Sequence, residues 1–267
     1  MALALCACGD NSADNNDDDD DKYVDNGKDN IDDNDDNDGT HECVDNDGDN
    51  LCDTCGKAVS EGQLEFTLNE DGESYAVAGI GSYTGTNVTV PSTYNNKPVT
   101  IVARRAFDNC KNLKSVTLPD SITTIYDMAF EDCISLTNID LGNGIIIISD
   151  NAFFGCESLT DFTFPNSIVV IGKTSFTNCK NLTNVTLPSY ISTIDNSTFH
   201  GCENLTSVTI SGNVTRINMW AFENCKNLTS INFGGTRKQW NAVEKGNSWD
   251  LGCGNYVVHC TDGDISK

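Results

Sequence analysis

The 267-residue sequence is poor in histidine, and this shortage narrows the possible functions. It contains three histidines, His41, His200 and His259, and none of them stands in a Ser-His-Asp arrangement. No phosphate-binding loop and no glycine-rich nucleotide motif occurs either. Polysaccharide hydrolysis needs a pair of acids at one site, and the acidic residues of the repeats described below do not pair at matching positions. We therefore expect a protein that is not an enzyme.

Basic residues are also scarce, which excludes two classes of partner. Sixteen Lys and Arg residues are outnumbered by forty Asp and Glu residues, so the formal net charge is -24 at pH 7. Such a chain is not expected to bind nucleic acid or an anionic lipid surface through charge. No apolar run is long enough to span a bilayer as a helix.

The acidic charge is concentrated near the start of the chain. Between Asp10 and Asp38 there are fourteen Asp and seven Asn residues and few large apolar ones. This composition cannot bury enough apolar surface to offset the loss of chain entropy on folding. We expect residues 9–40 to form a disordered tether that repels itself and stays extended.

The first residues suggest a membrane anchor. Leu5-Cys6-Ala7-Cys8-Gly9 resembles the cleavage box of a bacterial lipoprotein, with Cys8 as the residue that carries the lipid. On this interpretation residues 1–8 are the remnant of a truncated signal sequence, and the protein is an extracellular lipoprotein at the cell surface. The alternative is an ordinary short N-terminus. Membrane contact is expected only through the lipid on Cys8.

Residues 41–58 contain a dense cluster of metal-binding side chains. One interpretation is a structural zinc site, because three thiolates and an imidazole suit tetrahedral zinc; its ligands would be His41, Cys43, Cys52 and Cys55. The other is a structural calcium site built from carboxylates at alternate positions; its ligands would be Asp45, Asp47, Asp49 and Asp53. A small turn closed by a disulfide is the third possibility.

The most regular feature is a phrase that recurs every 23 residues. Its six copies share small-Phe-x-x-Cys-x-x-Leu-x-x-apolar-x-apolar and start at Ala106, Ala129, Ala152, Ser175, Thr198 and Ala221. In each copy the alternating apolar pair predicts a short strand with one buried face. A second inward pair follows, such as Ile191 and Ile194. The Phe, Cys and Leu positions lie three apart and indicate a helical or 3₁₀ turn.

One copy cannot bury these apolar groups alone, but stacked copies can, because each supplies a wall for the next. We therefore predict a mainly β repeat solenoid, a right-handed stack of 23-residue coils resembling leucine-rich repeats, with short helical or 3₁₀ turns. Equivalent phenylalanines, leucines and cysteines would form three columns. Because free Cys is small and commonly buried, the cysteine column is interpreted as structural rather than as a redox or metal ladder.

The repeat resembles that of the BspA-like leucine-rich repeat family of bacterial and protist surface proteins. The resemblance rests on A-F-x-x-C-x-x-L-x-x-V-x-L-P and covers roughly Leu64 to Ile265. The commoner leucine-rich repeat has an asparagine that this repeat replaces; the positions hold Ser121, Gly144, Ser167, Tyr190 and Asn213. Deep horseshoe curvature is therefore not expected. The resemblance implies adhesion to host matrix, host cells or other microbes, through protein or glycan ligands.

The six repeats, residues 106–233, are expected to lie between two caps. In the N-terminal cap, residues 59–105, strands are predicted at Asn87 to Pro91 and at Val99 to Ile101. In the C-terminal cap, residues 234–267, Trp240 and Val243 would face inward from a short helix. The segment NYVVHC, residues 255–260, would be the closing strand. A disulfide between Cys253 and Cys260 is a further hypothesis.

One pair of coils departs from the polar pattern of the others. Most coils have a sequence such as ITTI or ISTI, but the second has four isoleucines at 145–148 and the third has IVVI at 168–171. The two middle residues should point outward, so an apolar patch is predicted at Ile146, Ile147, Val169 and Val170. The alternative is a locally reshaped core. We interpret the patch as a partner-binding surface of an adhesion protein; the alternative function is a structural spacer or scaffold.

Overall fold

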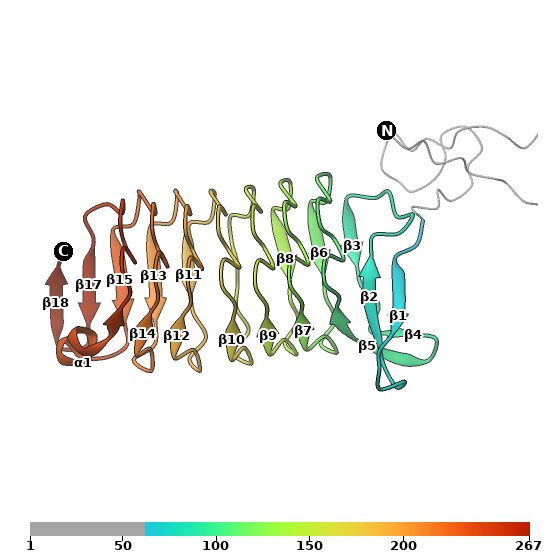
Figure 1. Cartoon of the computed structure of the whole chain (residues 1–267), viewed down its shortest axis with the longest axis horizontal. Coiled ribbons are helices and arrows are strands. Elements are labelled where there is room, and N and C mark those ends of the chain that lie inside the picture. The colour runs from blue at the N-terminus through green and yellow to red at the C-terminus, as the bar shows by residue number, and fades with distance from the viewer. Residues whose placement is uncertain (1–61) are drawn as a thin grey trace, which may run out of the picture. The chain divides into compact units, whose positions relative to one another are not determined.

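A computed structural model describes residues 62–267 of the chain. Three predictions lie outside the described residues: the lipid on Cys8, the tether at 9–40 and the metal-binding cluster within 41–58. The chain from Gly62 to Lys267 forms one compact unit. It is a mainly β solenoid whose coils stack along one axis (Figure 1), so the predicted fold is confirmed. We number the coils one to six from Ala106, Ala129, Ala152, Ser175, Thr198 and Ala221.

Each regular coil contributes two short strands, which form two rows along the solenoid (Figure 1). The first row contains β3 (Asn87–Thr89), β6 (Ser115–Thr117), β8 (Asn138–Asp140), β11 (Asn184–Thr186), β13 (Ser207–Ile210), β15 (Ser230–Phe233) and β17 (Val257–Cys260). The second row contains β5 (Lys97–Val102), β7 (Thr124–Ile125), β9 (Ile147–Ile148), β10 (Val170–Ile171), β12 (Thr193–Ile194), β14 (Arg216–Ile217) and β16 (Glu244–Lys245).

Strands of neighbouring coils pair in a register that equals the 23-residue period of the sequence. Val116 pairs in parallel with Ile139, and Val185 pairs in parallel with Val208. Each partner lies 23 positions further along the chain. Because side chains alternate across a strand, this register puts the apolar residue of every coil into one continuous core. All six repeat phenylalanines are fully buried there.

The phenylalanine column is a stack of nearly parallel rings. Successive ring centroids lie 5.1 Å apart between Phe107 and Phe130 and 5.6 Å apart between Phe176 and Phe199. The interplanar angle is 4° for the first pair and 17° for the second. The predicted column is therefore confirmed, and the spacing is close to the roughly 4.8 Å that separates neighbouring strands.

The Phe, Cys and Leu positions are linked by single i→i+3 hydrogen-bonded turns, as the 3₁₀ form of the prediction requires, and not by a continuous helix. The Cys179 amide donates to the Phe176 carbonyl at 3.2 Å, and the Leu182 amide donates to the Cys179 carbonyl at 3.1 Å. Between them Asn178 adopts a left-handed backbone, with φ of 61°. This residue breaks the helical path, and its amide instead donates to the next coil at the His200 carbonyl, 2.8 Å away.

The cysteine column is structural, as predicted, and it has a hydrogen-bonding role as well. Five thiols are buried, and each donates to the phenylalanine carbonyl of the preceding coil; Cys179 reaches the Phe153 oxygen at 3.3 Å. Cys110 begins the column and is only half-buried. Burial, together with the nearby Asp108 carboxylate, raises the pKa of Cys110 to about 11.

The proposed disulfide between Cys253 and Cys260 is wrong, because both residues are free thiols. Cys253 instead continues the column into the cap, where its thiol donates to the Phe222 carbonyl at 2.9 Å. A hydrogen bond from Cys225 lowers the pKa of the Cys253 thiol. Cys260 lies at the end of β17, in the first strand row. Cys253 lies instead in the cysteine column.

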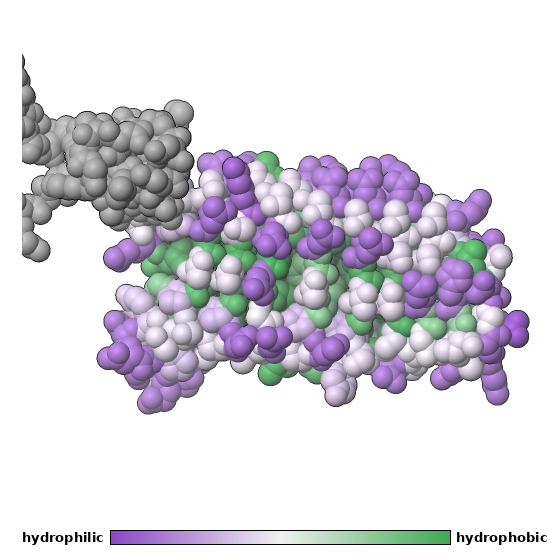
Figure 2. Space-filling model, turned by 180° about the vertical axis from the view of Figure 1, so that it is seen from behind, coloured by the Kyte–Doolittle hydropathy of each residue, from purple (hydrophilic) through white to green (hydrophobic). Residues whose placement is uncertain are grey.

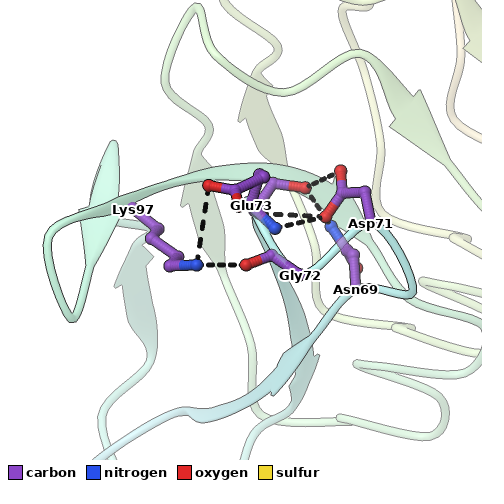
Figure 3. A network of polar contacts seen from close by, with 6 residues as sticks. Asn69, Asp71, Gly72, Glu73 and Lys97 are labelled. Atoms are coloured by element: carbon purple, nitrogen blue, oxygen red, sulfur yellow. Dashed lines mark hydrogen bonds and ion pairs between the residues drawn. The ribbon is translucent and has the colours of Figure 1, made fainter.

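The N-terminal cap is built on an antiparallel hairpin of β1 (Glu65–Leu68) and β2 (Tyr75–Gly79), with β4 (Thr93–Tyr94) beside β5. Asp71 orders the hairpin turn by accepting hydrogen bonds from the Glu73 amide at 2.8 Å and the Ser74 hydroxyl at 2.8 Å (Figure 3). These bonds, the Glu73 amide foremost, lower the pKa of Asp71. Lys97 of β5 contacts the same turn at the Gly72 carbonyl and at Glu73.

The C-terminal cap contains α1 (Arg237–Ala242), the one helix in the described part of the chain. A capping box between Thr236 and Gln239 begins the helix. Trp240 and Val243 are buried, as predicted. The predicted closing strand is β17, but it is not the last one, because β18 (Gly263–Ser266) pairs with it in antiparallel orientation and forms the edge. Within residues 62–267 no helix is both long and apolar enough to cross a membrane.

The phenylalanine column generates a stability prediction. Phe176 is fully buried, so replacing Phe176 with Ala should lower the free energy of unfolding by about 3–5 kcal/mol, through lost apolar contact and the cavity left behind. The exposed Thr117, changed to Ala, is the matched control and should cost within about 0.5 kcal/mol. Urea unfolding followed by circular dichroism measures both. Equal effects of the two substitutions would contradict a shared core.

The cysteine column generates a reactivity prediction. Only the thiolate is alkylated, and burial raises the pKa of Cys179 far above its usual range, so native protein should not label there with iodoacetamide. Cys253 and Cys260 should label, and Cys253 should do so at lower pH, because its pKa is lowered while that of Cys260 is raised. Quantitative mass spectrometry of tryptic peptides measures each site. Native labelling of Cys179 as fast as Cys260 would show that the column is open.

Candidate functional site: the outer face of the seven-stranded sheet

The N-terminal half of the second strand row belongs to one seven-stranded sheet, in which β1, β2, β5, β7, β9 and β10 lie in this order and β4 pairs with β5. In coils two and three the inward residues of this row are buried: Ile145, Ile148, Ile168 and Ile171. These side chains complete the core beneath the sheet. The residues between them are left on the outer face.

The structure brings the four predicted patch residues together on this outer face. The exposed fraction is 42% for Ile146, 48% for Val169 and 45% for Val170, while Ile147 is half-buried. Ile147 pairs in parallel with Val170, and the Val169 amide donates to the Ile146 carbonyl at 3.0 Å. The alternative of a reshaped core is therefore not what the structure shows.

The apolar surface extends further toward the N-terminal cap than the sequence predicts. A groove of about 490 Å³ lies on the same sheet, nearer the N-terminal cap, with Asn69, Glu70 and Arg104 among its lining residues. Its apolar wall consists of Leu68, Ala76, Ile101, Ala103 and Tyr126. Ile101 pairs with Thr124, which in turn pairs with Ile147, so the groove and the patch are joined by the strand register.

Tyr126 is the residue of this groove that the sequence could have revealed. Its side chain is 45% exposed. It follows the last inward residue of its coil, at the position that holds Ser149, Gly172, Asp195 and Asn218 in the next four coils. A large aromatic ring among small and polar residues is a visible departure from the repeat, whereas Leu68 and Ile101 reach the groove only through the folding of the cap.

The apolar face ends where the sheet ends. No strand pairing joins β10 to β12 in residues 62–267, and β12, β14 and β16 form a separate three-stranded sheet. The outward positions of that second sheet are Thr193, Arg216 and Glu244, and the last two form an ion pair at 2.6 Å. In this row the outward residues are apolar in coils two and three, whereas they are Thr123 and Thr124 in coil one and polar again beyond β10.

Figure 2 shows the hydropathy of one face of residues 62–267. On the face drawn in Figure 2, apolar surface runs as an interrupted band along the long axis of residues 62–267, with polar side chains above and below it. A rim of polar residues around an apolar strip is typical of surfaces that contact other proteins.

The histidines of the described chain have simple surroundings. His200 lies 3.2 Å from the Glu223 carboxylate, and His259 lies 2.9 Å from that of Asp264, each on the surface of the solenoid. Among residues 62–267 no group of three or more His, Cys, Asp or Glu side chains could hold a metal ion. The zinc and calcium ligands predicted between His41 and Cys55 lie outside this part.

Comparisons with known proteins agree on the repeat. The model of the BspA type leucine rich repeat region matches residues 79–168 and 146–242, in six copies. A crystal structure of a leucine rich repeat protein from T. pallidum has a TM-score of 0.62 and 31% identity, over 68% of this chain and 83% of that one. No curated protein matches the chain.

Two further solved structures are similar over part of their length. A leucine rich cell surface protein from Faecalibacterium prausnitzii has a TM-score of 0.62 and 26% identity, over 76% of this chain and 55% of that one. A leucine-rich repeat protein from Bacteroides ovatus, with a TM-score of 0.50 and 22% identity over 67% of this chain and 55% of that one, shares the fold. This chain spans about half the length of both.

The family model extends over more than half of the chain, and the repeat that it describes is the unit that forms the coils. This chain belongs to the BspA type leucine-rich repeat family.

Proposed function

We propose that residues 62–267 are a recognition module without catalytic activity, which binds another protein through the apolar face of the seven-stranded sheet. One observation carries the proposal: Ile146, Val169 and Val170 are exposed side by side on the sheet that also holds the groove at Tyr126, while the equivalent row beyond β10 is polar. Exposed apolar area costs free energy in water, and binding a complementary protein surface removes that cost.

The setting that we propose is the outside of a cell, with adhesion to host or neighbouring cells as the role. The F. prausnitzii relative is described as a cell surface protein, and the lipoprotein-like box at Cys8 would supply the anchor. Protein and glycan ligands are both within the proposal; the exposed Ile146, Val169 and Val170 side chains favour a protein, because they cannot form hydrogen bonds. The second candidate is a structural spacer, in which the solenoid only displays other parts of the chain.

We also propose that residues 41–58 hold a structural metal ion. The support is the sequence alone, in which a C-x-x-C pair at Cys52 and Cys55 follows His41 and Cys43, and aspartates stand at alternate positions between them. The metal would fold the segment without taking part in a reaction. The zinc and calcium versions differ in their ligands, so one measurement separates them.

The patch proposal predicts a loss of binding without a loss of stability. The double variant Ile147→Ser and Val169→Ser should weaken binding to a protein ligand at least about tenfold, which corresponds to about 1.4 kcal/mol. The Val169→Ser change should alter the free energy of unfolding little, because this side chain is exposed. The neighbouring Ile148 is fully buried, so Ile148→Ser should instead unfold the protein more easily, by about 2–5 kcal/mol.

Surface plasmon resonance against immobilised fibronectin, laminin and collagen measures the binding, with Thr193→Ala as the control on the polar half of the row. Unchanged binding by the double variant would remove the patch from the proposed interface. Binding to none of the three proteins, with a monomer in sedimentation, would favour the spacer. A dimer that the double variant dissociates would make a second copy of the chain the partner.

The metal proposal predicts a stoichiometric ion in the purified full-length chain. Inductively coupled plasma mass spectrometry should find about one zinc or one calcium per chain, since either set of ligands fills one coordination sphere. Substituting Cys52 and Cys55 with Ser should remove zinc and leave calcium. Absence of both metals in protein purified without chelator would leave the disulfide-closed turn.

A further inference from the structure

Coil three is out of line with its neighbours in the first strand row. The Leu118 amide donates to the Asp140 carbonyl at 2.8 Å, and the Leu187 amide donates to the Thr209 carbonyl at 3.0 Å. The equivalent amides of Leu141 and Phe164 have no such backbone bond to the next coil within residues 62–267. In this row coil three contributes a single bridge between Asp161 and Asn184 and a hydrogen bond from the Thr183 amide to the Thr160 carbonyl at 3.2 Å.

Two bulky residues distinguish the strand segment of coil three. Phe162 occupies a position that holds Val or Ile in the other five coils. Phe164 occupies a position that holds Leu or Ile in four of those five coils. Both rings turn into the core, and Phe162 lies 5.2 Å from Phe153 and 4.7 Å from Phe176 between ring centroids. Phe233 of coil six occupies the position of Phe164 with its ladder intact, so the departure specific to coil three is Phe162, whose extra volume is expected to strain a core packed at native density.

The opened ladder leaves a cleft of about 380 Å³ between coils three and four. Its apolar lining includes Phe162, Phe164 and Leu187, and its polar lining includes Asp161, Asn166 and Asn184. This volume is within the range of small-molecule sites, roughly 300–1,000 Å³, which combine an apolar lining with a few placed polar groups. No basic side chain is among the residues that line it.

The polar groups of the cleft have spare hydrogen-bonding capacity. The contact that the Asp161 carboxylate accepts is a long one, 3.5 Å from the Thr160 hydroxyl. Asn166 makes no side-chain hydrogen bond within the described part of the chain, although its amide can donate and accept. A ligand rich in hydroxyl groups could satisfy both, since each hydroxyl also donates and accepts.

We propose that this cleft binds a neutral saccharide. Ring hydroxyls would donate to the Asp161 carboxylate and exchange hydrogen bonds with the amides of Asn166 and Asn184, while the sugar would contact only the small exposed edges of the apolar lining. An acidic glycan would meet the Asp161 charge without a basic partner. An extended peptide would need a free sheet edge, and here coil four closes the cleft on one side.

The proposal is independent of the apolar face on the second strand row, and the experiment keeps the two apart. Isothermal titration of the full chain with cellotriose, maltotriose, mannotriose and chitotriose should show binding of at least one trisaccharide. A hyaluronan tetrasaccharide and a neutral tetrapeptide are the comparison probes and should bind more weakly. Asp161→Ala should weaken the trisaccharide at least about tenfold, because a hydrogen bond to a charged group is lost.

Two variants control for folding. Ser207→Ala changes the position of coil five equivalent to Asp161 and should leave saccharide binding unchanged. The double variant Phe162→Val and Phe164→Leu restores the pattern of the other coils, so it should close the cleft and abolish saccharide binding without lowering the melting temperature. If that variant does not fold, the comparison of Asp161→Ala with Ser207→Ala decides.

Three outcomes would overturn the proposal: no trisaccharide binds at millimolar concentration, Asp161→Ala leaves the affinity unchanged, or the tetrapeptide or the hyaluronan probe binds more tightly than every trisaccharide. The Ile147→Ser and Val169→Ser variant should retain saccharide binding, and Asp161→Ala should retain binding of the protein ligand. A negative result for one binding site therefore does not contradict the proposal for the other.

Discussion

The structure depends on one constraint: no coil can shield its own apolar side chains, so every coil must lie in register with the next. The six repeat phenylalanines are fully buried only because a ring, or the N- or C-terminal cap, covers each side. A shift of one residue would turn the buried face of each strand outward. This explains why the period of 23 residues is kept from Ala106 to Ala221 without an insertion.

The same constraint decides what the cysteines do. Each buried thiol sits one coil beyond the phenylalanine carbonyl that it contacts, as Cys202 does with the Phe176 oxygen at 3.2 Å. The thiol is small enough for the corner and still offers a weak donor to a buried carbonyl that needs one. The column is therefore part of the stacking rather than a store of reactive sulfur, and in the cap Cys253 occupies the same place after a longer segment of chain.

In a solenoid with such strict stacking, the features specific to this protein lie where the sequence departs from the repeat. Coils two and three carry isoleucine and valine on the outer face of one row, and coil three carries Phe162 and Phe164 in the other. The first change places apolar side chains on the outer surface of the row whose sheet ends at β10. The second accompanies the interrupted ladder of the other row. Both proposed binding surfaces therefore lie on the same part of the solenoid, on different rows of strands, and for different physical reasons.

The sequence by itself determined the repeat, the two rows of strands, the three columns and the exposed patch at Ile146, Ile147, Val169 and Val170. With a fixed period, the alternation of apolar and polar residues within one coil also predicts which residues of neighbouring coils are in contact. Only the tertiary structure decided the groove at Tyr126, the cleft beside Asp161 and the free thiols of Cys253 and Cys260. These features depend on how unequal side chains displace a strand and on how the caps fold back. The displacement of a strand and the folding of the caps cannot be predicted from the repeat period, because both are departures from the repeat.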